Sequence, residues 1–278
     1  LFSITFCAEL FLKKEKKKPQ ERMPGENEEQ QRQQPARGTE ALLSHVAQHK
    51  VDVALWATRV LTILFAFGYL IPIFGNSQSA YYKVLIANAA TSALRLHQRL
   101  PRVSFSREFL SQLLLEDSCH YLFYSLIFLY VSPVILIILP VVLFAVLHSA
   151  SYSLTLLDTL GQNSWWGARL MISIVEFQTR NILRLAAFTE VCLMPFSIVL
   201  VILGKAGLMT PLIYYHFLTM RYTSRRNPYT RNIFYECRLA AEMIVNNPSV
   251  PAIISKIIRA GISFVSRLAP PIQQAPQQ

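Results

Sequence analysis

The chain has 278 residues, of which 53% are hydrophobic and only 15% are charged. Soluble globular domains carry about 25% charged residues, so this composition excludes an ordinary soluble protein and predicts an integral membrane protein. The net charge of +11 raises nucleic-acid binding as an alternative, but the sequence contains no zinc finger, basic zipper or RNA-binding motif. We expect no nucleic-acid partner, because basic residues beside membrane spans ordinarily face the cytosol.

Catalytic and metal-binding motifs are missing from the sequence. The cysteines at positions 7, 119, 192 and 237 have no paired spacing, so neither a disulfide framework nor a zinc site is indicated. There is no phosphate-binding loop, nucleophile elbow or HExxH helix. We therefore expect a non-enzymatic protein with no cofactor, no metal and no small-molecule substrate.

The chain begins with a polar segment, residues 1–50, which we predict to be a disordered tail. Lys13–Gly38 is charged, rich in Gln and nearly free of large apolar residues. Such a segment cannot bury enough apolar surface to offset the entropy lost on ordering. The basic run Lys13–Lys18 has two open interpretations, contact with anionic lipid or simple solvation.

Residues 51–222 form the predicted membrane domain, which we divide into three helical hairpins at about 52–100, 109–152 and 182–221. In the first hairpin, an apolar segment ends near Asn76 and is followed by a helix rich in small residues. Small side chains allow helices to approach closely within lipid. We expect the domain to be all-α, because helices satisfy their own backbone hydrogen bonds in lipid.

The second hairpin contains the longest uncharged segment, Cys119–Leu147. As a straight helix it would extend about 43 Å, which is too long for one crossing of about 30 Å of hydrocarbon. Ser132 precedes Pro133, and a residue before proline is pushed out of the α region. The pattern predicts two helices with a tip at Val131–Pro133, and a single Pro-kinked, tilted span is the alternative.

The distribution of basic residues predicts the orientation of the domain. If the hairpin tips lie near Asn76, Ser132 and Lys205, only Lys83 and Lys205 of the 27 Lys and Arg residues fall on the tip side. The excess of Lys and Arg faces the cytosol in membrane proteins. We therefore predict that both termini are cytosolic.

A polar cluster precedes the long uncharged segment. We expect Glu116, Asp117 and His120 to form structural pairs with Arg95 and Arg99, because charged residues near membrane depth are usually paired within protein. Glu116 and His120 are four residues apart and would face one another on a helix.

Glu190 in the third hairpin has Arg184 and His216 as candidate partners. The alternative function for these polar residues is a transporter or channel that uses Glu116, Asp117, His120 and Glu190 as a path. After the third hairpin, Arg221, Arg225 and Arg226 are either contacts to lipid phosphates or a stop-transfer charge cluster.

Residues 223–270 are predicted to form a cytosolic region of amphipathic helices, followed by a disordered tail at 271–278. The second of these helices combines an apolar face with a basic stripe, a pattern suited to lying in a lipid headgroup layer. Packing of this face on the protein's own spans is the alternative. The predicted membrane-interface residues are Ile254, Ile257, Ile258, Phe264, Val265 and Leu268 on the apolar face, with Lys256, Arg259 and Arg267 on the polar side.

Several segments resemble a known family in order along the chain. They are ALRLHQRLP at 93–101, LLEDSCHY at 114–121, YSLIF at 124–128, FLTMRYTSRRNPY at 217–229 and FVSRLAP at 264–270. These segments are similar to the transmembrane protein 33/Krüppel homologue 2 family, which includes the fungal pore-membrane protein Pom33. The similarity covers roughly residues 45–270.

The resemblance implies a non-enzymatic membrane protein of the endoplasmic reticulum and nuclear envelope, without catalytic residues to transfer. It implies the lipid bilayer and reticulon-type membrane-shaping proteins as partners, with nucleoporins or an import receptor as further candidates. It also implies roles in the tubular network, nuclear pore organisation and unfolded-protein signalling. Membrane binding by the family's C-terminal amphipathic helices would fall on Ile253–Leu268 and less securely on Ile233–Val245.

Overall fold

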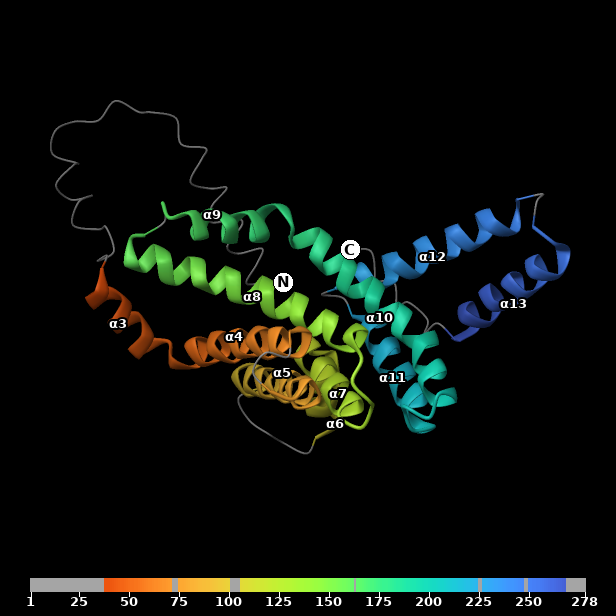
Figure 1. Ribbon diagram of the computed structural model, residues 1–278, viewed down its shortest axis with the longest axis horizontal. Coiled ribbons are helices and arrows are strands. Elements are labelled where there is room, and N and C mark those ends of the chain that lie inside the picture. Colours follow the sequence, from red (N-terminus) through yellow and green to blue (C-terminus); the bar gives the residue numbers. More distant parts are fainter. Residues whose placement is uncertain are drawn as a thin grey trace, which may run out of the picture.

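The computed structural model describes residues 38–71, 75–100, 106–162, 164–224, 227–247 and 250–268. All regular elements within these ranges are helices, so the predicted all-α class is confirmed (Figure 1). The α-helices are α3 (Thr39–Gln48), α4 (Lys50–Leu70), α5 (Ser77–Arg99), α6 (Arg107–Leu115), α7 (Asp117–Phe128), α8 (Ile135–Leu160), α9 (Trp166–Ile172), α10 (Thr179–Ile202), α11 (Met209–Thr223), α12 (Tyr229–Val245) and α13 (Ala252–Leu268). A π-helical turn at Ser173–Phe177 connects α9 to α10.

Three of these helices, α4, α8 and α10, are long and apolar enough to cross a membrane. Their outer surfaces carry large exposed apolar side chains, among them Leu64 and Phe67 on α4 and Ile202 on α10. Exposed apolar surface of this kind is stable when it faces lipid rather than water. The chain is therefore a polytopic membrane protein.

The first predicted hairpin corresponds to α4 and α5, which lie side by side (Figure 1). The Asn76 side chain accepts a hydrogen bond from the backbone N–H of Gln78 and caps α5. The Ser77 hydroxyl donates to the Tyr69 carbonyl at 2.9 Å, which links the two ends of the turn.

The long uncharged segment is broken between α7 and α8, where residues 129–134 are not helical. The prediction of two helices at this position therefore agrees with the structure, and a single kinked helix does not. The two helices pack mainly on other partners, however, α7 on α5 and α11, and α8 on α4 and α10. α8 also continues to Leu160, beyond the predicted end at 152, and stops at Gly161, whose φ of 80° suits a glycine.

The tips of the second and third hairpins are in direct contact. The backbone N–H of Ser132 donates a hydrogen bond to the carbonyl of Lys205 at 3.0 Å. Lys205 lies in the turn between α10 and α11. The two turns therefore lie at the same end of the molecule.

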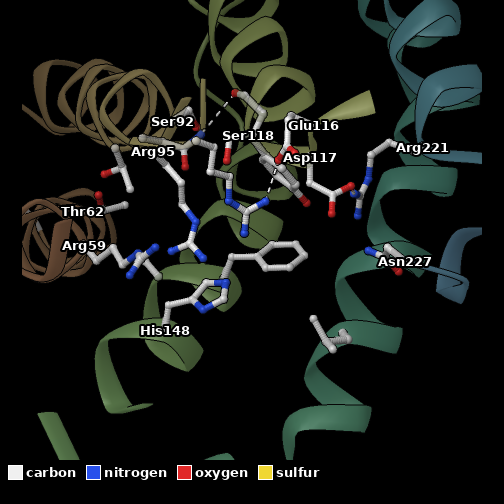
Figure 2. A pocket seen from close by; sticks show the side chains of 17 residues that line it. Arg59, Thr62, Ser92, Arg95, Glu116, Asp117, Ser118, His148, Arg221 and Asn227 are labelled. Atoms are coloured by element: carbon white, nitrogen blue, oxygen red, sulfur yellow. Dashed lines mark hydrogen bonds and ion pairs between the residues drawn. The ribbon is translucent and has the colours of Figure 1, made fainter. Parts of the chain in front are cut away.

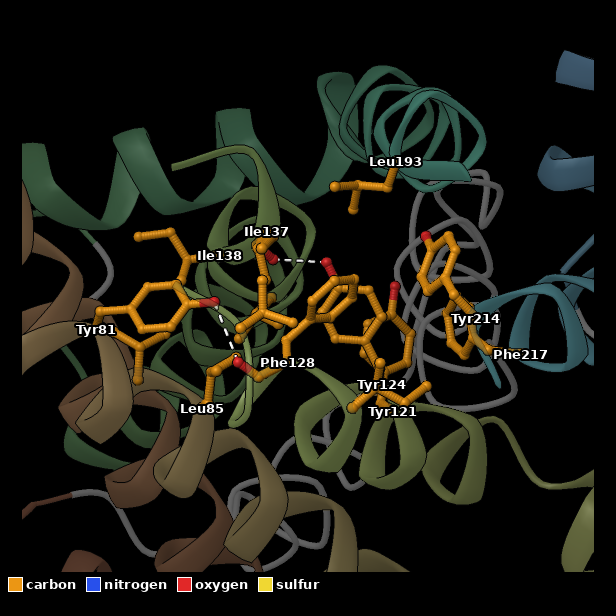
Figure 3. Close-up of a cluster of buried hydrophobic side chains, with 14 of the residues drawn as sticks. Tyr81, Leu85, Tyr121, Tyr124, Phe128, Ile137, Ile138, Leu193, Tyr214 and Phe217 are labelled. Atoms are coloured by element: carbon orange, nitrogen blue, oxygen red, sulfur yellow. Dashed lines mark hydrogen bonds between the residues drawn. The ribbon is translucent and has the colours of Figure 1, made fainter. Parts of the chain in front are cut away.

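An aromatic cluster from α7 and α11 forms the centre of the core (Figure 3). Among Tyr124, Phe128, Tyr214 and Phe217, every ring pair except Phe128 with Phe217 has its centroids 4.8–6.2 Å apart, in tilted or edge-on arrangements and with one stacked pair. The Tyr124 hydroxyl donates to the Ile137 carbonyl at 2.6 Å. Buried tyrosines need such partners, and this one fixes the start of α8 against α7.

The predicted extent of the disordered tail is wrong at its C-terminal end, because Thr39–Gln48 forms α3. Ala41, Leu42 and Val46 lie on one side of this helix and are half-buried. Gly38 N–H also donates to the Thr159 carbonyl at 3.1 Å at the end of α8. The segment therefore has enough apolar surface to pack on the spans. The rest of the predicted tail, residues 1–37, lies outside the described residues.

Candidate functional site

A buried ion-pair network joins four helices. Arg221 on α11 donates from Nε to Glu190 Oε2 at 3.1 Å and from Nη1 to Asp117 Oδ1 at 3.1 Å. Arg221 and Glu190 are 1% and 0% exposed. The Tyr121 hydroxyl donates to the other Glu190 oxygen, and Thr230 at the start of α12 reaches Glu190 at 3.4 Å. The network satisfies charges that would be costly to bury alone and fixes α7, α10, α11 and α12 together.

A further ion pair, between Arg99 at the end of α5 and Glu116 before α7, lies beside this network. Arg99 Nη1 lies 2.6 Å from Glu116 Oε2. Glu116 has an extended backbone just before α7 begins, so the helical geometry expected to bring Glu116 and His120 face to face starts only after Glu116. His120 instead bonds through Nε2 to the Leu114 carbonyl at 2.7 Å, and its Nδ1 lies 3.8 Å from Asp117.

The sequence leaves Arg221 as either a contact to lipid phosphates or part of a stop-transfer charge cluster, and the structure places it in the buried ion-pair network instead. Its guanidinium is buried and binds two carboxylates through Nε and Nη1, so Arg221 is not part of an exposed basic cluster. The two other residues of that prediction, Arg225 and Arg226, lie outside the described residues.

The partner of Glu190 is also different from the two candidates read from the sequence. Arg184 pairs with Glu236 of α12 at 2.7 Å, at the surface. The true partner, Arg221, is far from Glu190 along the chain, and only helix packing brings the two together.

A cavity of about 410 Å³ lies beside the two ion pairs, between α4, α5, α7 and α8 (Figure 2). Four arginines and two carboxylates are among its lining residues, together with polar side chains such as Thr62, Ser92 and Asn227. Among the residues that the structure describes, no group of His, Cys, Asp and Glu side chains is placed to hold a metal ion. The six charged residues of the lining are Arg59, Arg95, Arg99, Arg221, Glu116 and Asp117.

Two lining residues, Arg59 and His148, were not among the sequence-derived candidates. Arg59 is only 8% exposed, although it lies within the apolar helix α4. His148 lies within α8, and its ring stacks on Phe144. A charged residue inside a span ordinarily faces protein or a polar cavity. The position of Arg59 within an apolar span could therefore have identified it as a candidate cavity residue.

The C-terminal helix α13 exposes the apolar face predicted from its sequence. Ile257 and Phe264 are 66% and 64% exposed, and no described side chain of α13 is buried. Five other predicted interface residues are also exposed, namely Ile254, Val265, Lys256, Arg259 and Arg267. Ile258 is half-buried, and the side chain of Leu268 lies outside the described residues.

The preceding helix, α12, behaves differently from α13. It packs on α10 and buries Ile233 and Val245 at 3% and 8% exposure. The apolar face of α12 is therefore packed internally. α13 contacts α12, and the described residues of its own apolar face are exposed or half-buried.

Residues 34–271 match the family model described as Transmembrane protein 33/Nucleoporin POM33. The chain is 56% identical to Krueppel homolog 2 of Drosophila melanogaster over 237 residues, which cover 85% of each protein. It is 46% identical to Transmembrane protein 33 of Rattus norvegicus over 226 residues, 81% of this chain and 92% of the relative. No solved structure matches the chain. The family-model match covers the ion-pair network, the cavity and α13, and the chain therefore belongs to the Transmembrane protein 33/Nucleoporin POM33 family.

Proposed function

We propose that this chain is a non-enzymatic protein of the endoplasmic reticulum and nuclear envelope that influences membrane shape. The observation that carries the proposal is the open apolar face of α13, on which Ile257 and Phe264 are exposed beside the basic residues Lys256 and Arg259. A helix of this kind lies in the plane of the lipid interface with its apolar face in the acyl boundary. Its insertion expands one leaflet relative to the other and favours curvature.

We further propose that both termini and α13 are cytosolic. Lys83 lies near the first hairpin tip, and Lys205 lies in the turn that bonds to Ser132. All other Lys and Arg residues are assigned to the opposite side by the hairpin arrangement. The positive-inside rule then supports a cytosolic position for that side. In this orientation α13 expands the cytosolic leaflet, which is the outer, convex leaflet of a tubule.

Reticulon-type membrane-shaping proteins and components of the nuclear pore are the partners we propose. The family description names a nucleoporin, which supports a role in nuclear pore organisation. The exposed apolar surfaces of the spans offer contact area to other membrane proteins as well as to lipid. An import receptor is a further candidate for the basic cytosolic regions.

Labelling of single cysteines tests the orientation. In a chain without its native cysteines, we expect Asn76→Cys, Ser132→Cys and Lys205→Cys to react with an impermeant maleimide only after the reticular membrane is permeabilised. The reason is that all three positions lie at the hairpin tips, on the luminal side. A cysteine at Ser263 on α13 is the control and should react before permeabilisation. Labelling of the Ser132→Cys variant from the cytosolic side would contradict the proposed orientation.

Rescue of cells that lack the protein tests the role in membrane shape. Wild-type protein should restore the balance between tubules and sheets, whereas Ile257→Glu plus Phe264→Glu should not, because α13 no longer inserts in lipid. Ser263→Glu plus Ser266→Glu adds the same two charges to the polar side of α13 and should rescue. The fraction of reticulum in tubules, measured by fluorescence microscopy, decides the outcome. Full rescue by the first variant would contradict the proposal.

The transporter or channel alternative receives little support from the polar cluster. Glu116 is bound to Arg99, and Asp117 and Glu190 are bound to Arg221. A carboxylate that is already neutralised by an arginine binds a transported cation weakly. We therefore assign these ion pairs to the assembly of the helices.

A further inference from the structure

The cavity beside the ion-pair network holds more positive than negative charge. Arg99 is paired with Glu116, and Arg221 is paired with Asp117 and Glu190. Arg59 and Arg95 have no hydrogen bond or ion pair to any residue that the structure describes. Both guanidinium groups point into the cavity, near His148 (Figure 2). Two cationic side chains therefore line one space without a direct ion-pair partner, and the carboxylates that act on them, Asp52 on both and Glu116 on Arg95, do so from a greater distance.

This arrangement is costly unless something else supplies negative charge. Arg59 is 8% exposed and Arg95 is half-buried. A cation removed from bulk water loses much of its hydration, which a close counter-charge and hydrogen bonds restore. Their neighbours Arg99 and Arg221 each form a direct ion pair with a carboxylate, whereas Arg59 and Arg95 have only the more distant charges of Asp52 and Glu116. The contrast indicates that an external anion completes the site.

The remaining lining suits a phosphate group. Guanidinium groups bind phosphate oxygens through paired, charge-assisted hydrogen bonds. Hydroxyl and amide side chains, including Thr62, Ser92, Ser118 and Asn227, lie around the same space (Figure 2). The volume of about 410 Å³ is within the usual range for small-molecule sites and leaves room for more than a bare phosphate. Phe144, Ala145 and Leu183 add an apolar wall.

The position of the cavity places it within reach of lipid headgroups. α4 continues for about 16 Å from Arg59 to Leu70 at 1.5 Å per residue, toward the hairpin tips. Arg95 lies in the last part of α5, at the end away from those tips. The Arg95 end of the cavity therefore lies on the side of the membrane domain opposite the tips, which is the side that the proposed orientation turns toward the headgroups of the cytosolic leaflet.

We propose that this cavity binds the phosphate group of an anionic ligand, with Arg59 and Arg95 as its charge partners. Two sources carry this chemistry, the headgroup of an anionic phospholipid and a soluble phosphate compound. The site is independent of α13 and of the proposed role in membrane shape. Occupancy would stabilise the packing of α4 against α5 by neutralising the two arginines.

The full chain in neutral detergent provides the test. Its unfolding temperature is measured with increasing short-chain phosphatidic acid, short-chain phosphatidylcholine, glycerol 3-phosphate or inorganic phosphate. Phosphatidic acid should raise the unfolding temperature, and phosphatidylcholine at the same concentrations should not. In Arg59→Gln plus Arg95→Gln, the phosphatidic acid needed for half of the shift should rise about 100-fold, because two charge-assisted hydrogen bonds are lost.

Arg184→Gln is the matched control, because it removes one arginine from a surface pair outside the cavity, and it should keep the full response. The double variant without ligand should unfold at the wild-type temperature or above, since it removes two unpaired cations. If it does not fold, Arg95→Gln alone, at the more exposed position, gives the same comparison.

The outcomes separate the two sources. A response to phosphatidic acid but not to the soluble phosphates identifies a lipid headgroup, and equal responses to glycerol 3-phosphate or inorganic phosphate identify a soluble ligand. Either result, if lost in the arginine variant, supports the site. An unchanged response in that variant, an equal response to phosphatidylcholine, or no response to any phosphate overturns the proposal.

Discussion

Replacement of Arg221 by Gln is expected to destabilise the membrane domain by about 3–5 kcal/mol, the usual cost of breaking a buried ion pair on one side. Glu190, which is 0% exposed, would lose its cation, and Asp117 would lose the same partner. The Tyr121 and Thr230 hydroxyls cannot replace a full positive charge. Thermal unfolding of the purified chain in detergent, compared with wild type, measures the change.

Arg184→Gln is the control for that experiment, since it breaks an ion pair with Glu236 at the surface. Exposed pairs contribute below about 1 kcal/mol, so this variant should unfold close to wild type. Glu190→Gln combined with Arg221→Gln should recover part of the loss, because neither partner then leaves a buried charge. Equal unfolding temperatures for wild type and Arg221→Gln would show that the ion-pair network does not hold the helices together.

The second large effect is expected at α13. Ile257→Glu plus Phe264→Glu should release this helix from the lipid interface, because each buried side chain contributes about 1.5–3 kcal/mol of transfer free energy. Together they correspond to a change of roughly 100-fold or more in the equilibrium between inserted and released helix. Ile253 is 73% exposed on the same face. A fluorophore attached to Ile253→Cys therefore reports insertion of α13 through quenching by brominated lipid.

The control variant of α13 introduces the same two negative charges on the opposite, polar face of the helix. Ser263→Glu plus Ser266→Glu places two carboxylates on the polar side, so quenching at position 253 should stay near the wild-type value. The difference between the two variants isolates apolar burial from electrostatic attraction. If both variants reduce quenching equally, charge rather than the apolar face holds the helix at the membrane.

Local features of the fold could be predicted because their causes lie close together in the chain. The break before α8 follows from the backbone restriction that Pro133 imposes on Ser132. The amphipathic pattern of α13 follows from helical periodicity alone. In contrast, α3 was missed because its few apolar residues are stable as a helix only when packed on α8, and this packing is not visible in composition.

Most of the charged site could not be predicted from the sequence, because its ion pairs join residues that are brought together only by helix packing. Glu116 and Arg99 could be associated in advance, since their segments follow one another along the chain. The partnership of Glu190 with Arg221 depends on how α10 and α11 face each other, which spacing does not determine. Arg59 could have been recognised as a cavity residue from its place in an apolar span, but its lack of a carboxylate partner is a property of the assembled helices.

The contact between Thr230 and Glu190 has a mechanical consequence. It anchors the first turn of α12 to the charged centre of the molecule, and the Arg184–Glu236 pair adds a second attachment farther along the same helix. α12 is therefore held to the spans at two points along its length, and α13, which packs on α12, takes its position from the same attachment.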